Sequence, residues 1–187
     1  MKYVFVFIIV TILNSAVIGQ QQTPSLYQLS FAGLDKDQIN MSDYKGKKII
    51  VVECDAAKPD KQELLFLDSL YKSRKSNLVV IAIPVEDFGQ TPQEKELKKL
   101  WRDTLKLSFP VAKISKAKKA NGAAQHKLLN WLTNKNQNNH FEEDVDADGQ
   151  AFVISESGSV YSCLKDKKYV TNTQIINLIL EQKPQDN

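Results

Sequence analysis

Two apolar runs stand out in the pattern of hydrophobic and polar positions. Residues 49–52 (Ile-Ile-Val-Val) and residues 78–84 (Leu-Val-Val-Ile-Ala-Ile-Pro) lack the polar alternation of a strand that has one solvated face. Short apolar runs without alternation are typical of strands that are buried on both faces, as in a parallel sheet. We therefore predict two adjacent core strands at these positions.

Apolar residues recur at helical spacing in four other segments. Residues 60–63 (Asp-Lys-Gln-Glu) have the spacing of a capping box and precede a leucine-rich stretch that ends at Tyr71, which predicts a helix between the two core strands. The same periodicity predicts helices over residues 92–105, 125–133 and 171–182. The chain therefore alternates strands with amphipathic helices.

The remaining strands are predicted near the two ends of this pattern. Residues 150–154 and 159–164 flank Glu-Ser-Gly and predict a hairpin, and the alternation over residues 25–31 predicts a short first strand. Strand, helix, strand, hairpin and helix, in that order, give one parallel crossover and one antiparallel return. We expect an α/β, thioredoxin-like fold with a mixed central sheet and flanking helices, forming one domain over residues 25–182, with a polar tail at 183–187.

The N-terminal segment has the pattern of a signal peptide. Its apolar stretch, residues 4–13, spans about ten residues and is followed by small residues at Val17 and Gly19. A membrane-spanning helix needs roughly 20 apolar residues. We predict a signal peptide over residues 1–19, a linker over residues 20–24, export to the periplasm or the secreted space, and no transmembrane span after cleavage. An uncleaved N-terminal anchor is the alternative.

Composition narrows the function classes. The 187 residues are 42% hydrophobic and 25% charged, as in an ordinary globular protein. The 25 lysine and arginine residues are nearly balanced by 22 acidic residues, which gives a net charge of +3. So small a charge does not indicate nucleic-acid binding. Two cysteines and two histidines without metal-site spacing predict no metal cluster. Two cysteines are still sufficient for thiol redox chemistry, and no partner is indicated.

Four short segments of the sequence form a recognisable set. They are Met-Ser-Asp-Tyr-Lys-Gly-Lys at 41–47, Ile-Pro-Val-Glu-Asp-Phe-Gly at 83–89, Phe-Pro at 109–110, and Asn-Gly leading to Gln-His-Lys-Leu-Leu-Asn-Trp-Leu at 121–132. The last segment is the most specific. In their order and separations, the four together resemble the glutathione peroxidase family over about residues 25–180.

The resemblance implies a specific chemistry. In this family a thiolate or selenolate attacks the O–O bond of a hydroperoxide, and glutathione or thioredoxin restores the oxidised product. The reactive anion lies at the end of a core strand and receives hydrogen bonds from a glutamine, a tryptophan and an asparagine. No other cofactor is implied.

The sequence departs from that pattern at every chemical position. Alignment places the nucleophile at Ala57 or at Lys58, depending on the anchor used, and neither is a cysteine. The family's glutamine falls on Asp87, its tryptophan on Ala147 and its asparagine on Asp148. All of the groups that would form or stabilise the anion are missing where they are expected.

Cys54 is the one thiol near the expected site. It precedes Ala57 by three residues, which along a strand is roughly 10 Å and beyond reach of the same donors. A buried structural cysteine is one interpretation, and a relocated redox thiol is the other. Cys163 is predicted on the second hairpin strand, two strand spacings or roughly 9.6 Å from the Cys54 strand, so we expect no disulfide between them.

The replacements at the expected site share a negative charge. Carboxylates such as Glu53, Asp87 and Asp148 raise the pKa of a neighbouring thiol and oppose its anion. Two interpretations follow: a solvated acidic rim that Lys58 partly neutralises, or a cation site that uses Asp87 and Asp148.

These observations lead to one functional expectation and one alternative. We expect an exported glutathione-peroxidase-like protein that has lost the peroxidase reaction and acts as a binding or interaction module. The alternative is a thiol-dependent peroxidase that acts through Cys54, with glutathione or thioredoxin as its reductant.

Overall fold

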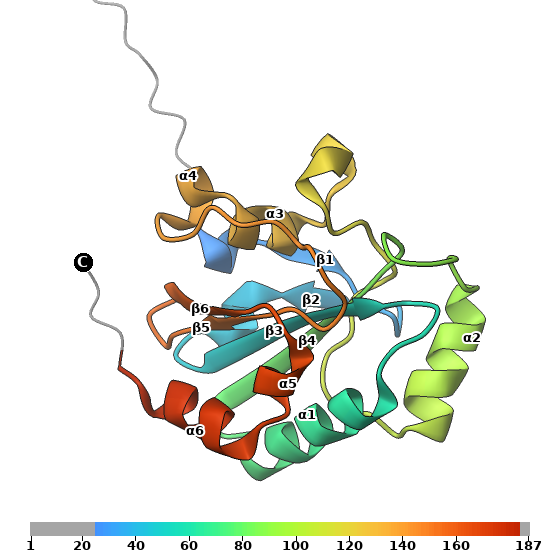
Figure 1. Ribbon diagram of the computed structural model, residues 1–187, viewed down its shortest axis with the longest axis horizontal. Helices are drawn as coiled ribbons and strands as arrows, with labels where there is room; N and C mark the ends of the chain where they lie inside the picture. The colour runs from blue at the N-terminus through green and yellow to red at the C-terminus, as the bar shows by residue number, and fades with distance from the viewer. Residues whose placement is uncertain (1–24, 184–187) are drawn as a thin grey trace, which may run out of the picture.

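A four-stranded mixed sheet forms the centre of the structure, a computed structural model that describes residues 25–183 (Figure 1). Its strand order is β4-β3-β5-β6. The strands are β3 (Lys48–Asp55), β4 (Leu78–Val85), β5 (Ala151–Ile154) and β6 (Val160–Leu164). The predicted signal peptide at residues 1–19, the linker at 20–24 and the last four residues of the predicted tail lie outside the described residues.

Smaller elements and helices surround this sheet. A two-stranded hairpin, β1 (Ser30–Ala32) and β2 (Gln38–Asn40), precedes it. The helical elements are η1 (Leu26–Gln28), η2 (Met41–Tyr44), α1 (Lys61–Ser73), α2 (Glu94–Lys98), η3 (Lys99–Thr104), η4 (Lys119–Ala124), α3 (Lys127–Thr133), α4 (Lys135–Asn138), α5 (Lys167–Val170) and α6 (Thr173–Glu181). None of the helices among residues 25–183 has the length and apolar character needed to cross a membrane.

The strand pairing confirms the predicted topology. β3 pairs in parallel with β4 over its whole length, from Lys48 opposite Leu78 to Asp55 opposite Val85. β5 runs antiparallel on the other side of β3, with Val52 opposite Ala151. The parallel pair is joined through α1, and the hairpin supplies the antiparallel return, as the element order predicts. The α/β, thioredoxin-like fold is therefore confirmed.

Helices cover both faces of the sheet, which explains the two unbroken apolar runs. On β3, Ile50 and Val52 pack toward α1, α2 and α6, whereas Ile49 and Val51 pack toward α3. Figure 1 shows α1 and α6 on one side of the sheet and α3 with α4 on the other. All eight residues of β3 and of β4 are buried. A strand without a solvated face has no position at which alternation would be favoured.

The N-terminal strand prediction is wrong in its first half. Residues 26–28 form one turn of 3₁₀ helix, and β1 begins only at Ser30. The turn is closed because the Gln28 backbone N–H donates to the Ser25 carbonyl at 2.9 Å, and the Ser25 N–H donates to Gln28 Oε1 at 2.9 Å. A local side-chain hydrogen bond thus outweighs the alternating pattern.

The predicted helices are present with different bounds. The helix predicted over 92–105 begins at Glu94 and becomes a π-helical stretch from Lys99 to Thr104, which keeps Leu97 and Trp101 buried. The helix predicted over 125–133 begins at Lys127, and the one predicted over 171–182 begins at Thr173. In the last case Asn172 caps the helix through hydrogen bonds from the N–H groups of residues 174 and 175.

Candidate functional site

The candidate site lies where the parallel strands end. The carboxyl ends of β3 and β4 meet at one edge of the sheet, and the segment from Asp55 to Asp60 leads from there into α1. Ala57 is half-buried and Lys58 is exposed on this segment. The Ala57 backbone N–H donates to Asp55 Oδ1 at 2.8 Å. Both candidate nucleophile positions therefore reach the predicted edge, with a methyl group and an ammonium group in place of a thiol.

Cys54 belongs to the core rather than to this edge. Its side chain is 1% exposed, faces the cluster that includes α1, and lies with Sγ 4.0 Å from the Ile83 carbonyl oxygen. Burial raises the pKa of the Cys54 thiol well above its usual value, and the neighbouring carboxyl groups of Glu53 and Glu63 raise it further. A reactive cysteine needs an accessible thiolate, so this environment suppresses redox chemistry.

Asp148 closes the site from the loop that precedes β5. Its Oδ1 accepts a hydrogen bond of 2.7 Å from the Asp55 backbone N–H, while Ala147 beside it is exposed. A carboxylate that is held by the backbone in this way cannot donate a hydrogen bond to an anion. The position that aligns with the family's tryptophan presents only a methyl group to solvent.

Two buried glutamates lie under the loop. Glu53 is 0% exposed, and its Oε1 accepts a hydrogen bond of 2.9 Å from the Gln150 backbone N–H. Glu63 is 1% exposed, and one carboxyl oxygen of each residue has no hydrogen-bond partner among residues 25–183. Burial, together with the nearby Asp148 carboxylate, raises the pKa of Glu53 to about 9 and that of Glu63 to about 8. Both carboxyl groups thus keep their protons at neutral pH.

Glu63 was expected to complete a capping box, and its position corrects that interpretation. The Asp60 side chain does cap α1, accepting from the backbone N–H groups of Gln62 and Glu63 at 3.0 and 3.2 Å. The Glu63 carboxyl group instead packs beneath Gly149: a Cβ at that glycine would lie 3.0 Å from Glu63 Oε2. The spacing gave no signal for this contact, because it depends on a loop 86 residues further along the chain.

Gly149 shows how tightly the loop is packed. It adopts a positive φ of +81°, and a Cβ there would lie 2.8 Å from the Cβ of Lys167. Lys167 is also the cation of this region, because its Nζ lies 2.8 Å from Asp60 Oδ2. The acidic rim is therefore neutralised in part by Lys167 of α5, and no ion pair of Lys58 occurs among the described residues.

Asp87 has a local structural role. Its Oδ2 accepts from the Ala117 N–H at 2.6 Å, and its Oδ1 accepts from the Asn121 side-chain amide at 2.6 Å. Both oxygens thus hold the loop that contains η4. Residues 25–183 contain no group of three or more His, Cys, Asp or Glu side chains arranged to hold a metal ion. The cation site at Asp87 and Asp148 stays a prediction, and calorimetric titration with calcium, manganese and a polyamine would test it.

The second cysteine is remote from the first. Cys163 lies on β6, separated by β5 from the strand that carries Cys54, and both thiols are free. Burial raises the pKa of Cys163 to about 11, and its Sγ accepts a hydrogen bond of 3.5 Å from Gln150 Nε2. The strand order therefore keeps the two sulfur atoms apart, as the sequence predicts.

Known proteins show similarity in both sequence and fold. The family model for glutathione peroxidase matches residues 26–133, which is more than half of the chain. The chain belongs to the glutathione peroxidase family. The match covers Cys54, Ala57, Lys58 and Asp87 but ends before the loop that carries Ala147 and Asp148. None of the curated proteins compared with the chain matches it.

Solved structures share the fold at low sequence identity. The crystal structure of Trgpx in apo form is 22% identical, with a TM-score of 0.58, and the match covers 86% of this chain and 99% of that one. T. cruzi GPX1 is 16% identical with a TM-score of 0.62, covering 84% and 94%. A thioredoxin-family thiol:disulfide interchange protein from Chlorobium tepidum is 19% identical with a TM-score of 0.60, covering 84% and 96%. The thioredoxin-like fold is thus shared with both groups of proteins.

Proposed function

We propose that this member of the glutathione peroxidase family does not reduce peroxides by the family's reaction and acts as a noncatalytic binding or interaction module. The observation that carries this proposal is the state of the thiols. Neither Ala57 nor Lys58 carries a thiol group, and the nearest thiol, that of Cys54, is 1% exposed in the core. A peroxide therefore has no accessible sulfur at the carboxyl edge of the sheet.

The chemistry of peroxide reduction explains why this arrangement is unfavourable. A thiolate attacks one oxygen of the hydroperoxide, an S–O bond forms as the O–O bond breaks, and the departing alkoxide takes up a proton. The anion must be stable before the attack, which requires hydrogen-bond donors or positive charge. Burial instead raises the pKa of Cys54, and the carboxyl groups of Glu53, Glu63 and Asp148 at this edge raise it further.

A peroxidase assay tests this proposal against the alternative of a relocated thiol. Consumption of hydrogen peroxide and of cumene hydroperoxide would be followed with glutathione and with thioredoxin as reductants. We expect no turnover above the protein-free rate for the wild type. Turnover that disappears in Cys54→Ser but persists in Cys163→Ser would overturn the proposal and assign the reaction to Cys54.

We also propose that the protein is exported to the periplasm or secreted. The proposal rests on the short apolar stretch of residues 4–13 and on the small residues before the expected cleavage point after Gly19. Mass spectrometry of the protein recovered from its native host should give a chain that begins at Gln20. Recovery of the intact N-terminus from the cytoplasm would contradict export.

A further inference from the structure

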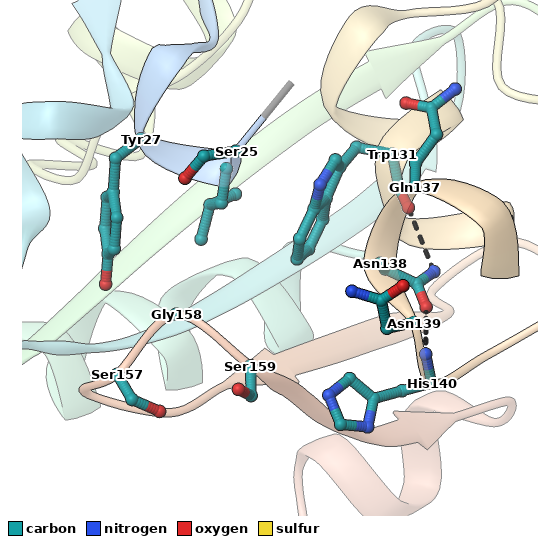
Figure 2. Close-up of a pocket in the computed structure, with 11 residues that line it drawn as sticks. Ser25, Tyr27, Trp131, Gln137, Asn138, Asn139, His140, Ser157, Gly158 and Ser159 are labelled. Atoms are coloured by element: carbon teal, nitrogen blue, oxygen red, sulfur yellow. Dashed lines mark hydrogen bonds between the residues drawn. The ribbon is translucent and has the colours of Figure 1, made fainter. Parts of the chain in front are cut away.

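A hollow of about 480 Å³ opens at the opposite end of the sheet from the candidate site. It lies between η1, the end of α3 with α4, and the turn that joins β5 to β6 (Figure 2). That turn follows Ile154, which pairs with Ile49 near the start of β3, whereas Cys54 lies near the end of the same strand. The hollow is thus separate from the edge at which the family places its chemistry.

The lining of the hollow is polar without formal charge. It contains no aspartate, glutamate, lysine or arginine, although these residues make up 25% of the chain. Its polar lining residues carry hydroxyl groups or side-chain amides, apart from the exposed His140. A charged ligand would find no ion-pair partner here, whereas a neutral ligand with many donors and acceptors would match the lining.

Two aromatic side chains face each other across the hollow. Figure 2 shows Tyr27 on one side and Trp131 on the other, with the 157–159 turn between them. Trp131 is 4% exposed, and its Nε1 is buried with no hydrogen-bond partner among the described residues. Trp101 Nε1, in the core on the other face of the sheet, is buried and unpartnered in the same way, so Trp131 marks the hollow by its position and not by its N–H group.

The walls are held rigidly by backbone contacts. The buried Asn138 side chain donates to the carbonyl oxygens of Trp131, Leu132 and Phe141 at 3.0, 2.9 and 3.0 Å. Its Oδ1 also accepts from the N–H groups of residues 140 and 141, both at 2.7 Å. Because these five bonds fix the chain between α3 and Phe141, the hollow is formed before any ligand binds.

The opposite wall is equally well defined. Gly158 has a positive φ of +95°, and a Cβ there would lie 2.8 Å from a ring carbon of Tyr27. The Tyr27 hydroxyl donates to the Glu156 carbonyl oxygen at 3.3 Å. The absence of a side chain at Gly158 therefore lets the tyrosine ring lie against the turn and form one side of the hollow.

We propose that this hollow binds a neutral, hydroxyl-rich small molecule such as a monosaccharide. The uncharged hydroxyl and amide lining matches sugar hydroxyls as both donors and acceptors. The half-buried ring of Tyr27 provides apolar surface for the C–H groups of the sugar, and the small exposed margin of Trp131 adds to it. The volume lies within the range of small-molecule sites. The proposal is independent of the peroxidase question, because most of the lining lies outside residues 26–133, the part that the family model matches.

The two tryptophans allow a direct test with an internal reference. Trp101 is fully buried on the α1 face of the sheet, whereas Trp131 belongs to the α3 face. The full chain, labelled with ¹⁵N, would be titrated separately with D-glucose, D-galactose, D-mannose and N-acetyl-D-glucosamine. The two indole N–H signals would be assigned with Trp101→Phe. We expect at least one sugar to move the Trp131 signal saturably, with a Kd of about 1 mM or tighter, while the Trp101 signal stays in place.

Substitutions distinguish this hollow from other surfaces. Tyr27→Ala removes one wall and should weaken binding at least ~10-fold, the equivalent of one lost aromatic contact. Tyr169→Ala, which changes a 41% exposed tyrosine on α5, should leave the affinity unchanged. The proposal is overturned if none of the four sugars moves the Trp131 signal saturably, or if Tyr27→Ala binds as tightly as the wild type. It is also overturned if titration with the anionic peptide glutathione moves the same signal with a lower Kd than titration with any of the sugars.

Discussion

The two ends of β3 carry opposite kinds of polar chemistry. At its carboxyl end, four acidic residues from three segments converge: Glu53, Asp55 and Glu63 are buried, and Asp148 is half-buried. Beyond its amino end, the hollow between Tyr27 and Trp131 is lined by uncharged groups and stays open. The candidate site lies at the acidic end.

The two ends of one strand thus differ in how their stability should respond to pH. The acidic end buries two proton-bearing carboxyl groups, so its stability should depend on pH. The neutral end is fixed by amide hydrogen bonds, so its stability should not depend on pH. Measurements that separate these two dependences test the comparison directly.

The largest effect is expected from Glu53 and Glu63. In the folded state their pKa values are raised to about 9 and about 8, whereas the unfolded chain has the ordinary value of 4.5. Below pH 4.5 both states carry the protons and folding has no penalty. As the pH rises from about 5 to about 9, the unfolded state ionises first, and the free energy of unfolding should fall by ~3 kcal/mol or more.

Paired amide substitutions isolate the contribution of these two glutamates to the free energy of unfolding. Glu53→Gln with Glu63→Gln keeps the shape and the acceptor for the Gln150 N–H, so the double variant should be more stable than the wild type at pH 8 and less sensitive to pH. Glu181→Gln, an exposed site at the end of α6, is the matched control. Urea unfolding at several pH values measures the difference, and parallel curves for the double variant and the wild type would contradict the raised pKa values.

A smaller, pH-independent effect is expected at the neutral end. Asn138→Ala removes five hydrogen bonds from a residue that is 4% exposed and leaves the carbonyl oxygens of Trp131 and Leu132 unpaired. The free energy of unfolding should fall by ~2–3 kcal/mol, equally at pH 5 and pH 8. The same urea series provides the measurement. A loss that changes with pH would mean that charge also stabilises this end.

The smallest effect separates charge from hydrogen bonding at Asp148. Asp148→Ala removes the acceptor of the Asp55 N–H and should cost ~1–2 kcal/mol. Asp148→Asn keeps an acceptor oxygen and removes one negative charge beside Glu53, so it should cost less than ~0.5 kcal/mol. Thermal unfolding of the two variants gives the comparison. Equal losses in both would show that the charge, rather than the hydrogen bond, holds the loop.

Much of the fold was predictable because it follows from local patterns. The unbroken apolar runs identified β3 and β4, the helical spacing identified α1 and α6, and the turn residues identified the hairpin of β5 and β6. The predicted bounds differ from the observed ones where side chains form hydrogen bonds with the nearby backbone. Gln28 closes a 3₁₀ turn, and Asn172 caps the last helix, which therefore begins at Thr173. These are choices between local hydrogen bonds that periodicity does not register.

The candidate site was predictable only in part. Alignment to the family assigns Ala57, Lys58 and Asp148 to one site, and the structure places them at the same edge of the sheet, while the strand order keeps Cys54 apart from Cys163. Glu63 and Lys167 were missed because their contacts join α1, α5 and the loop at Gly149, which are distant in sequence. The hollow beside Trp131 was missed for the same reason, since three separate segments form it.

The position of Cys54 also has a practical consequence for following the protein's motions. The Cys54 thiol lies near the carboxyl end of the central parallel pair but is only 1% exposed, so a labelling reagent should reach it only when β3 separates from its neighbours. Cys163 on the edge strand β6 is half-buried and should be exposed by smaller local openings. Without any engineered label, the rates of alkylation at the two cysteines therefore report global unfolding and local fraying of the same sheet.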